Sequence, residues 1–234
     1  MKVTLLASSQ IKMMNFDMIG GSEFDRYHAL IVGPSSDRLA HFAGRSCYQA
    51  WDMSNPATAN DMGYLANILR QGHESVLEHA SATFYIEGVS RSLLAEITRH
   101  RHLSFSVESQ RYVDYSNTEP VYPPASQPNE NYIINSAYDD ALDAYDRLYE
   151  NFREQGLTRK QAREAARSVL PNCAPVAIVC TGNHRAFRDM LKKRYSIHAD
   201  AEILALATEL LKQLREIAPG CYQDFPDAPF GTDG

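Results

Sequence analysis

Paired cysteines are missing from this sequence. Its four cysteines, Cys47, Cys173, Cys180 and Cys221, are dispersed, and no two of them form a Cys-x-x-Cys motif. Structural zinc sites and small disulfide scaffolds depend on closely spaced cysteines, so neither is indicated. We expect buried free thiols, as in proteins of a reducing compartment.

Long apolar runs are missing as well. The N-terminal run Val3–Ala7 is too short for the apolar core of a signal peptide. No run approaches the length of about 20 residues that a membrane-spanning helix needs. We therefore expect a cytoplasmic protein that binds no membrane.

The chain also has no internal repeat and no low-complexity tract. No Gly-x-Gly-x-x-Gly motif follows a predicted strand. That motif lets a backbone approach the pyrophosphate of a dinucleotide, so a Rossmann domain is not expected. The 234 residues are enough for one domain with a sizeable core, or for two small domains.

An excess of positive charge is absent too, since 23 Lys and Arg face 29 Asp and Glu, for a net charge of −6. This balance argues against a protein that binds nucleic acid through bulk charge. The charge is uneven, however. The segment Arg159–Arg194 holds nine Lys or Arg against only Glu164 and Asp189. A local basic patch on an acidic protein indicates a small anionic ligand.

The richest stretch in the chain is Arg99–Tyr112. It combines three arginines and two histidines with Ser104, Ser106, Glu108 and Ser109. Arginine presents a planar fork of donors that matches phosphate and stays charged at working pH. Hydroxyl groups beside such forks are typical of a site for a phosphorylated ligand. The alternative interpretation is a solvated basic turn.

Apolar periodicity and breaker residues predict the remaining elements. We expect loops over Ile11–Asp37, Trp51–Pro56, Gly72–Ala80 and Asn117–Asn131, and Gly88 should end the second strand. After the helix that Ser90 caps, the Arg99–Tyr112 stretch should enter a loop. The predicted strands are Met1–Ser8, Ser81–Ile86 and Val176–Cys180, and the predicted helices are Leu39–Cys47, Met62–Gln71, Arg91–His100, Tyr132–Gln155, Arg159–Leu170, His184–Tyr195 and Ala201–Ile217.

Three motifs carry a resemblance to a known family. Arg99-His100-Arg101, seven residues and then Ser109 resembles the signature of the flavin-dependent thymidylate synthases. Gly72–Ala80 is similar to the family's Gly-His-x-Ser/Thr-x-x-Glu-His element, and Arg194–Ala199 to its Arg-x-x-x-His-Ala element. The resemblance implies an α+β fold, with a twisted, mainly antiparallel sheet flanked by helices, in a single domain over 1–234. We also expect residues 227–234 to form a mobile tail.

The resemblance also implies an activity, the reductive methylation of dUMP to dTMP. The carbon would come from 5,10-methylenetetrahydrofolate, and the electrons from NADPH through FAD. The family assembles as a homotetramer whose flavin sites lie between subunits. Phosphates on both FAD and dUMP would explain an arginine-rich site on an acidic protein.

Site residues are carried over position by position. The family often has Asn-Glu where this chain has Ser106-Val107, so at Val107 we expect the backbone to serve. Asp189 is also not the commonest residue at its position. The implied dUMP residues are Glu96, Arg99, Val107, Glu108, Ser109, Gln110, Arg111, Arg167 and Arg194, and the implied FAD residues are Ser75, Arg99, His100, Arg101, Val107, Asn183, His184, Arg185 and Asp189.

Arg194 is the residue that we expect to be catalytic. Ser109 is the only signature residue placed to be a nucleophile, but a serine hydroxyl is weak without an adjacent base, and its neighbours Gln110 and Arg111 are not bases. The fixed charge of Arg194 can stabilise an anion that develops at N3/O2 of uracil. The alternative role for Arg194 is to complement the dipole at a helix end.

Two other functions stay open from the residues alone. A regulator that binds a nucleotide phosphate without turnover would use the same arginines. A metal-dependent hydrolase would use His73, His79, His100 and His102, although the spacing is not His-Glu-x-x-His. Bound FAD in purified protein would separate the flavoenzyme from both, and bound zinc or manganese would favour the hydrolase.

Overall fold

The chain folds as the predicted α+β combination. A computed structural model describes residues 1–12, 33–51 and 55–232. The strands are β1 (Lys2–Ser8), β2 (Ser81–Ser90), β3 (Ser104–Val107) and β4 (Pro175–Asn183); the helices are α3 (Ser35–Tyr48), α4 (Asp61–Arg70), α5 (Arg91–Ile97), α6 (Pro128–Glu154), α7 (Arg159–Ala166), α8 (His184–Arg194) and α9 (Ala201–Ile217); and the 3₁₀ turns are η1 (Pro56–Thr58), η2 (Glu74–Glu78), η3 (Arg167–Val169) and η4 (Pro219–Tyr222).

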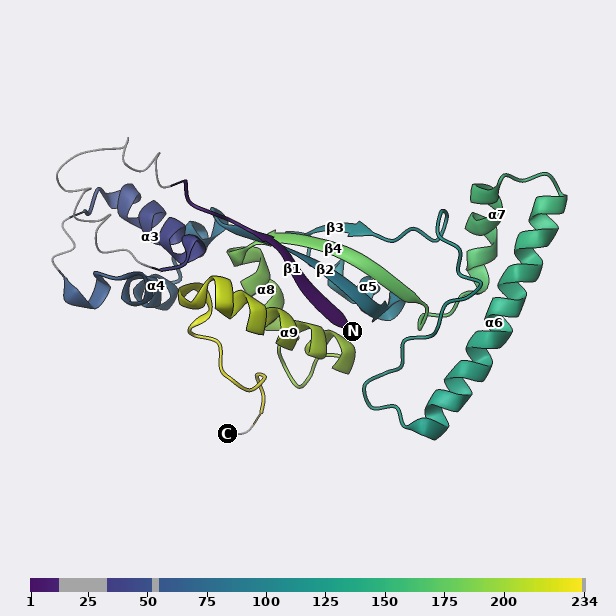
Figure 1. Cartoon of the computed structure of the whole chain (residues 1–234). Helices are drawn as coiled ribbons and strands as arrows, with labels where there is room; N and C mark the ends of the chain where they lie inside the picture. The colour runs from purple at the N-terminus through teal and green to yellow at the C-terminus, as the bar shows by residue number, and fades with distance from the viewer. Residues whose placement is uncertain (13–32, 52–54, 233–234) are drawn as a thin grey trace.

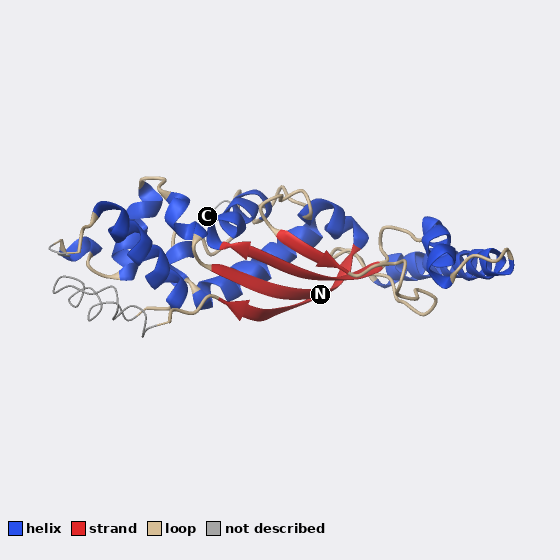
Figure 2. Cartoon of the chain, turned by 90° about the horizontal axis from the view of Figure 1, so that it is seen from above, coloured by secondary structure: helices blue, strands red, loops and turns tan. Residues whose placement is uncertain are grey.

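The four strands form one twisted sheet in the order β1-β2-β4-β3, and all neighbours are antiparallel. Burial alternates along β4, as expected for a strand with one face on a core. Helices α5, α8 and α9 lie on that face, and Figure 2 shows the strands in front of them. None of the helices in the described ranges is long and apolar enough to cross a bilayer.

The main core fills the space between the sheet and these helices. Phe84 of β2 meets Phe187 of α8 edge to face, with ring centroids 5.5 Å apart. The apolar stripe of α9, including Leu206, Leu210 and Leu214, is fully buried on the same side. This packing fixes α8, whose first and last residues were expected to belong to the site.

Helices α6 and α7 form an arm that projects from one end of the sheet (Figure 1). The arm has its own small core, in which Tyr115, Tyr138 and Tyr145 pack on Ala166 and Ala174. Thr158 and Gln161 form a capping box that starts α7. The first part of the basic segment Arg159–Arg194 therefore lies on the arm, and its second part returns to the sheet as β4 and α8.

Two predicted boundaries in the middle of the chain are wrong. The stretch after α5 does not stay a loop, because Ser104–Val107 pairs with β4 as the edge strand β3. Gly88 does not end the second strand either. It has φ +67° and lies where the pairing of β2 with β4 shifts register between Ile86 and Val89, so it forms a bulge inside β2.

Other predictions differ by smaller margins. Helix α3 begins at Ser35, inside the loop predicted over Ile11–Asp37, while residues 13–32 of that loop lie outside the described residues. The predicted break at Trp51–Pro56 lies partly outside them as well. Cys180 and Cys221 are buried free thiols as expected, whereas Cys47 is exposed.

The segment after Phe225 makes hydrogen bonds to the residues that follow α8. The Phe230 backbone N–H donates to the Tyr195 carbonyl, and the Ile197 N–H donates to the Phe230 carbonyl, both at 3.0 Å. The Tyr195 hydroxyl donates to the carbonyl of Asp227 at 2.6 Å. Residues 227–232, expected within a mobile tail, therefore dock against the segment that follows Arg194.

Candidate active site

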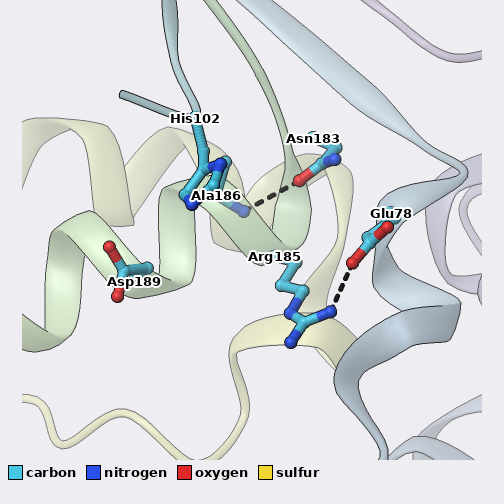
Figure 3. Close-up of a pocket in the computed structure, with 6 residues that line it drawn as sticks. All are labelled: Glu78, His102, Asn183, Arg185, Ala186 and Asp189. Carbon is cyan, nitrogen blue, oxygen red and sulfur yellow. Dashed lines mark hydrogen bonds and ion pairs between the residues drawn. The ribbon is translucent and has the colours of Figure 1, made fainter. Parts of the chain in front are cut away.

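A pocket of about 470 Å³ opens beside the first turns of α8. Asn183, the last residue of β4, caps the helix by accepting from the Ala186 N–H at 2.8 Å, which leaves the amide N–H₂ as a donor (Figure 3). Arg185 and Asp189 follow on the exposed side of the helix. The lining residues are Glu78, His102, Asn183, Arg185, Ala186 and Asp189.

A second pocket of about 340 Å³ adjoins the first, because Arg185 lines both. It contains Ser75, which lies on η2. Arg185 makes an ion pair with Glu78 of the same turn. The structure thus brings together four of the residues implied for FAD, from two segments about 100 residues apart: Ser75, Asn183, Arg185 and Asp189.

An ion network around the buried side chain of Arg188 ties these two segments to each other. The guanidinium of Arg188 is 1% exposed and makes a bidentate pair with Asp224, at 2.6 and 2.7 Å. Glu74, next to Ser75, lies 3.4 Å from Arg188 and 2.6 Å from the ammonium of Lys192. These two cations lower the pKa of Glu74 against the opposing effect of its burial. The η2 turn therefore has a fixed position against α8.

At the other end of α8, Arg194 is held from two sides. Its Nη1 donates to Glu96 Oε2 at 2.7 Å, and its Nε donates to His100 Nε2 at 3.1 Å. His100 is buried, and burial together with the charge of Arg194 lowers its pKa to about 4. The imidazole therefore stays neutral at pH 7 and accepts through Nε2. Glu96 pairs with Arg194 rather than with Arg99, its helix neighbour.

The residues that follow β3 gather near the arm instead. Ser109 Oγ accepts from the Arg111 N–H at 3.4 Å, and Arg111 pairs with Glu164 of α7 at 2.6 Å. Arg167, in the η3 turn at the end of α7, is exposed. Gln110 is half-buried in the same loop. The implied dUMP residues thus form two groups within one chain, one around Arg194 and one beside the arm.

A model of the family described as thymidylate synthase complementing protein matches residues 29–220. A probable flavin-dependent thymidylate synthase of Mycobacterium phage D29 is 48% identical over 244 residues, and the match covers 100% of both chains. The chain belongs to the flavin-dependent thymidylate synthase family. It is accordingly an enzyme of thymidylate synthesis.

Two further comparisons agree with this membership of the flavin-dependent thymidylate synthase family. The enzyme of Mycobacterium tuberculosis is 48% identical over 196 residues, which are 80% of this chain and 78% of that protein. Thymidylate synthase X from Helicobacter pylori, solved with FAD and dUMP, has a TM-score of 0.65 at 20% identity and covers 95% of this chain and 100% of its own. That likeness confirms the fold.

Two of the implied FAD positions, Arg99 and Arg101, are not held by other side chains in this flavin-dependent thymidylate synthase. Arg99 and Arg101 are exposed, and their side chains have no hydrogen bond or ion pair to another described residue. Val107 is half-buried on β3, where its backbone pairs with Ile178. The two arginines are therefore available to a ligand or to another subunit.

The side chain of His184, an implied FAD residue, lies in the core beneath α8. The imidazole is 0% exposed, and its Nδ1 lies 2.9 Å from the hydroxyl of Tyr222. Burial lowers its pKa to about 4. His184, Phe187 and Leu191 share one buried face of α8, so this imidazole packs in the core and does not face the pocket.

Sequence reasoning missed two residues that line the pocket beside α8, Glu78 and His102. Both have a signal in the sequence, since Glu78 belongs to the Gly72–Ala80 motif and His102 follows Arg101 directly. Within the ranges that the structure describes, no three His, Cys, Asp or Glu side chains gather to hold a metal ion. The four histidines of the hydrolase hypothesis form no such ligand set there.

Proposed function

We propose that this chain converts dUMP to dTMP, with 5,10-methylenetetrahydrofolate as carbon donor and NADPH as reductant through FAD. The observation that carries the proposal is the position of Arg194 at the end of α8, the helix whose first turns line the 470 Å³ pocket. Glu96 and His100 hold its guanidinium in place. The Helicobacter pylori structure with FAD and dUMP supports both ligands.

The two adjoining pockets fit a flavin dinucleotide in their chemistry. The guanidinium of Arg185 and the hydroxyl of Ser75 suit a phosphate, and the free N–H₂ of Asn183 suits the polar edge of a ring. When bound, FAD supplies the transfer of electrons from NADPH to the one-carbon unit. The protein contributes donors that the Glu74–Arg188 network holds in place.

Arg194 would act on the pyrimidine ring. Three of its five N–H groups contact Glu96 and His100, and the other two have no partner among the described residues. They can donate to the uracil carbonyl where negative charge develops. Arg111 and Arg167 would hold the phosphate, with Ser109 beside them. Ser109 has no base among its hydrogen-bond partners and is not proposed as the nucleophile.

A site shared between subunits would unite the two groups of dUMP residues. One group lies around α8, and the other lies beside the arm at the end of the sheet (Figure 1). A homotetramer in which one subunit's arm end meets the α8 pocket of another would complete the site. We expect native mass spectrometry to show a tetramer that carries FAD. A monomer with full flavin occupancy would contradict the shared site.

The proposal covers the whole chain as a single domain, which the full-length match to the phage D29 protein supports. It also includes a cytoplasmic location. The four free cysteines suit the reducing conditions of that compartment.

The proposed function is tested by rescue of a thymidine-requiring bacterium that lacks its own thymidylate synthase. We expect the wild-type gene to restore growth without thymidine and the Arg194→Ala variant to fail at equal expression. Failure of the wild-type protein, while it is folded and binds dUMP, would favour the non-catalytic regulator instead.

A further inference from the structure

The hydroxyl of Tyr115 lies at a junction that the family motifs do not include. The side chain is 0% exposed. Its hydroxyl lies 2.6 Å from Glu108 Oε1 and 2.9 Å from the carbonyl of Pro175, and it accepts from Arg91 Nη2 at 2.9 Å. The hydroxyl has one proton, and the closer, charged carboxylate takes it.

These contacts join three elements that are far apart in the sequence. Glu108 follows the last residue of β3, Pro175 is the first residue of β4, and Arg91 is the first residue of α5. Arg91 also donates to the backbone carbonyl of Glu108 at 2.9 Å. Tyr115 therefore fixes the start of the loop after β3 against the end of the sheet.

The same loop is fixed again further along. Arg163 of α7 donates to the carbonyl of Tyr112 and pairs with Asp114, both at 2.8 Å. Between these two attachments the loop makes a tight turn, in which the Tyr112 and Val113 N–H groups donate to the Ser109 carbonyl at 3.0 Å. Ser109, Gln110 and Arg111 lie in the span that is held at both ends.

Burial and the nearby carboxylate of Glu108 raise the pKa of Tyr115 to about 12. The hydroxyl is therefore protonated, and able to donate to Glu108, over the whole neutral range. Glu108 is half-buried, and Tyr115 is the one described residue that donates a hydrogen bond to its side chain. Without this donor the carboxylate would turn toward solvent, and the start of the loop would keep its backbone bonds to Arg91 and Ala177 but lose its link to Tyr115.

We propose that Tyr115 is a positioning residue for dUMP, which holds Ser109–Arg111 ready to receive the phosphate through its hydrogen bond to Glu108. This inference rests on the proposed function. Because the loop is already ordered before binding, it loses less conformational entropy when dUMP binds. Loss of this order therefore raises the Kd for dUMP without changing the chemical step.

The matched pair of variants is Tyr115→Phe and Tyr138→Phe. Both tyrosines are buried in the arm core, and each change removes one hydroxyl, but among the described residues that of Tyr138 hydrogen-bonds only to Thr118, at 2.7 Å. We expect calorimetric titration of FAD-loaded protein with dUMP to show about tenfold weaker binding for Tyr115→Phe and unchanged binding for Tyr138→Phe. Turnover at saturating dUMP and FAD retention should match the wild type in both.

Several results would overturn the inference. One is equal dUMP affinity in the two variants, and another is loss of maximal turnover or FAD in Tyr115→Phe. If Tyr115→Phe does not fold, Glu108→Ala, which removes the carboxylate that accepts from the Tyr115 hydroxyl, tests the bond from the other side and should weaken dUMP binding with FAD retained; normal binding refutes the inference.

A double variant adds a check on mechanism. If the two residues act through one bond, Tyr115→Phe/Glu108→Ala binds dUMP no more weakly than Tyr115→Phe alone. Additive losses would mean that Glu108 acts independently, and they would refute the positioning role. A wild-type protein that retains FAD but binds no dUMP would instead overturn the proposed function, and this inference with it.

Discussion

Replacing Arg194 by alanine should nearly abolish turnover while the fold stays intact. The side chain is 17% exposed and Glu96 is 33% exposed, so the pair is only partly desolvated and its loss costs less than about 1 kcal/mol of folding free energy. The same change removes the two unpartnered N–H groups that we assign to the uracil anion. Loss of one such transition-state contact lowers the rate by about 10²- to 10³-fold, or roughly 3–4 kcal/mol.

The assay is single-turnover oxidation of the reduced flavin with dUMP and methylenetetrahydrofolate, beside a thermal melt of each variant. Arg194→Lys keeps the charge, but one ammonium cannot contact both Glu96 and His100 as the fork does, so we expect an intermediate rate. Arg147→Ala removes an exposed arginine of α6 that bonds only the carbonyl of Asp143, and it controls for loss of charge. A near-normal rate in Arg194→Ala would refute the catalytic assignment.

Three further predictions follow from individual contacts. Ser109→Ala should keep measurable turnover, because no base contacts its hydroxyl; a dead variant that still binds dUMP would restore Ser109 as the nucleophile. Arg101→Ala should weaken FAD binding more than dUMP binding in equilibrium titrations, since the exposed guanidinium precedes the loop that holds the nucleotide; unchanged FAD affinity would remove it from the site. The pKa of buried His184 is about 4, below its ordinary 6.5, so the free energy of unfolding should fall by up to about 3 kcal/mol as pH drops from 7 to 4. In urea unfolding, the free energy of His184→Gln should depend less steeply on pH, and an equal dependence would contradict the burial of a neutral His184.

Local signals predicted the elements that line the pocket beside α8. Asn183 caps α8 and Pro219 follows the end of α9, and both residues act through their immediate neighbours. The strand β4 is an apolar run, and that run indicates a buried strand whichever strands pair with it. These elements were therefore visible in the sequence, and the antiparallel sheet followed from the family resemblance.

Long-range pairings were not visible in the same way. The β3 strand has only four residues, and it forms because β4, about 70 residues later, offers a free edge. Gly182 on β4 permits this approach, because a Cβ there would lie 2.4 Å from Leu103. The pairing of Arg194 with Glu96 joins residues 98 positions apart, so no local pattern signals it.

His184 was assigned to the site because it belongs to a motif. The helical spacing of its neighbours, which the sequence also contains, indicates a buried side chain instead. Residues 184, 187 and 191 recur at helical spacing, which puts the imidazole on the same face as Phe187 and Leu191. Motif membership marks a position in the chain, whereas helical phase decides where its side chain points. The two criteria disagree here, and the helical phase is correct.

The central claim is tested most directly by product formation with purified protein. Protein that releases FAD on denaturation is incubated with dUMP, methylenetetrahydrofolate and NADPH, and dTMP is measured by chromatography, with each component omitted in turn. We predict dTMP only when all three are present, and a loss of about 10²-fold or more in Arg194→Ala. Flavin-loaded wild-type protein that binds dUMP and forms no dTMP would contradict the account.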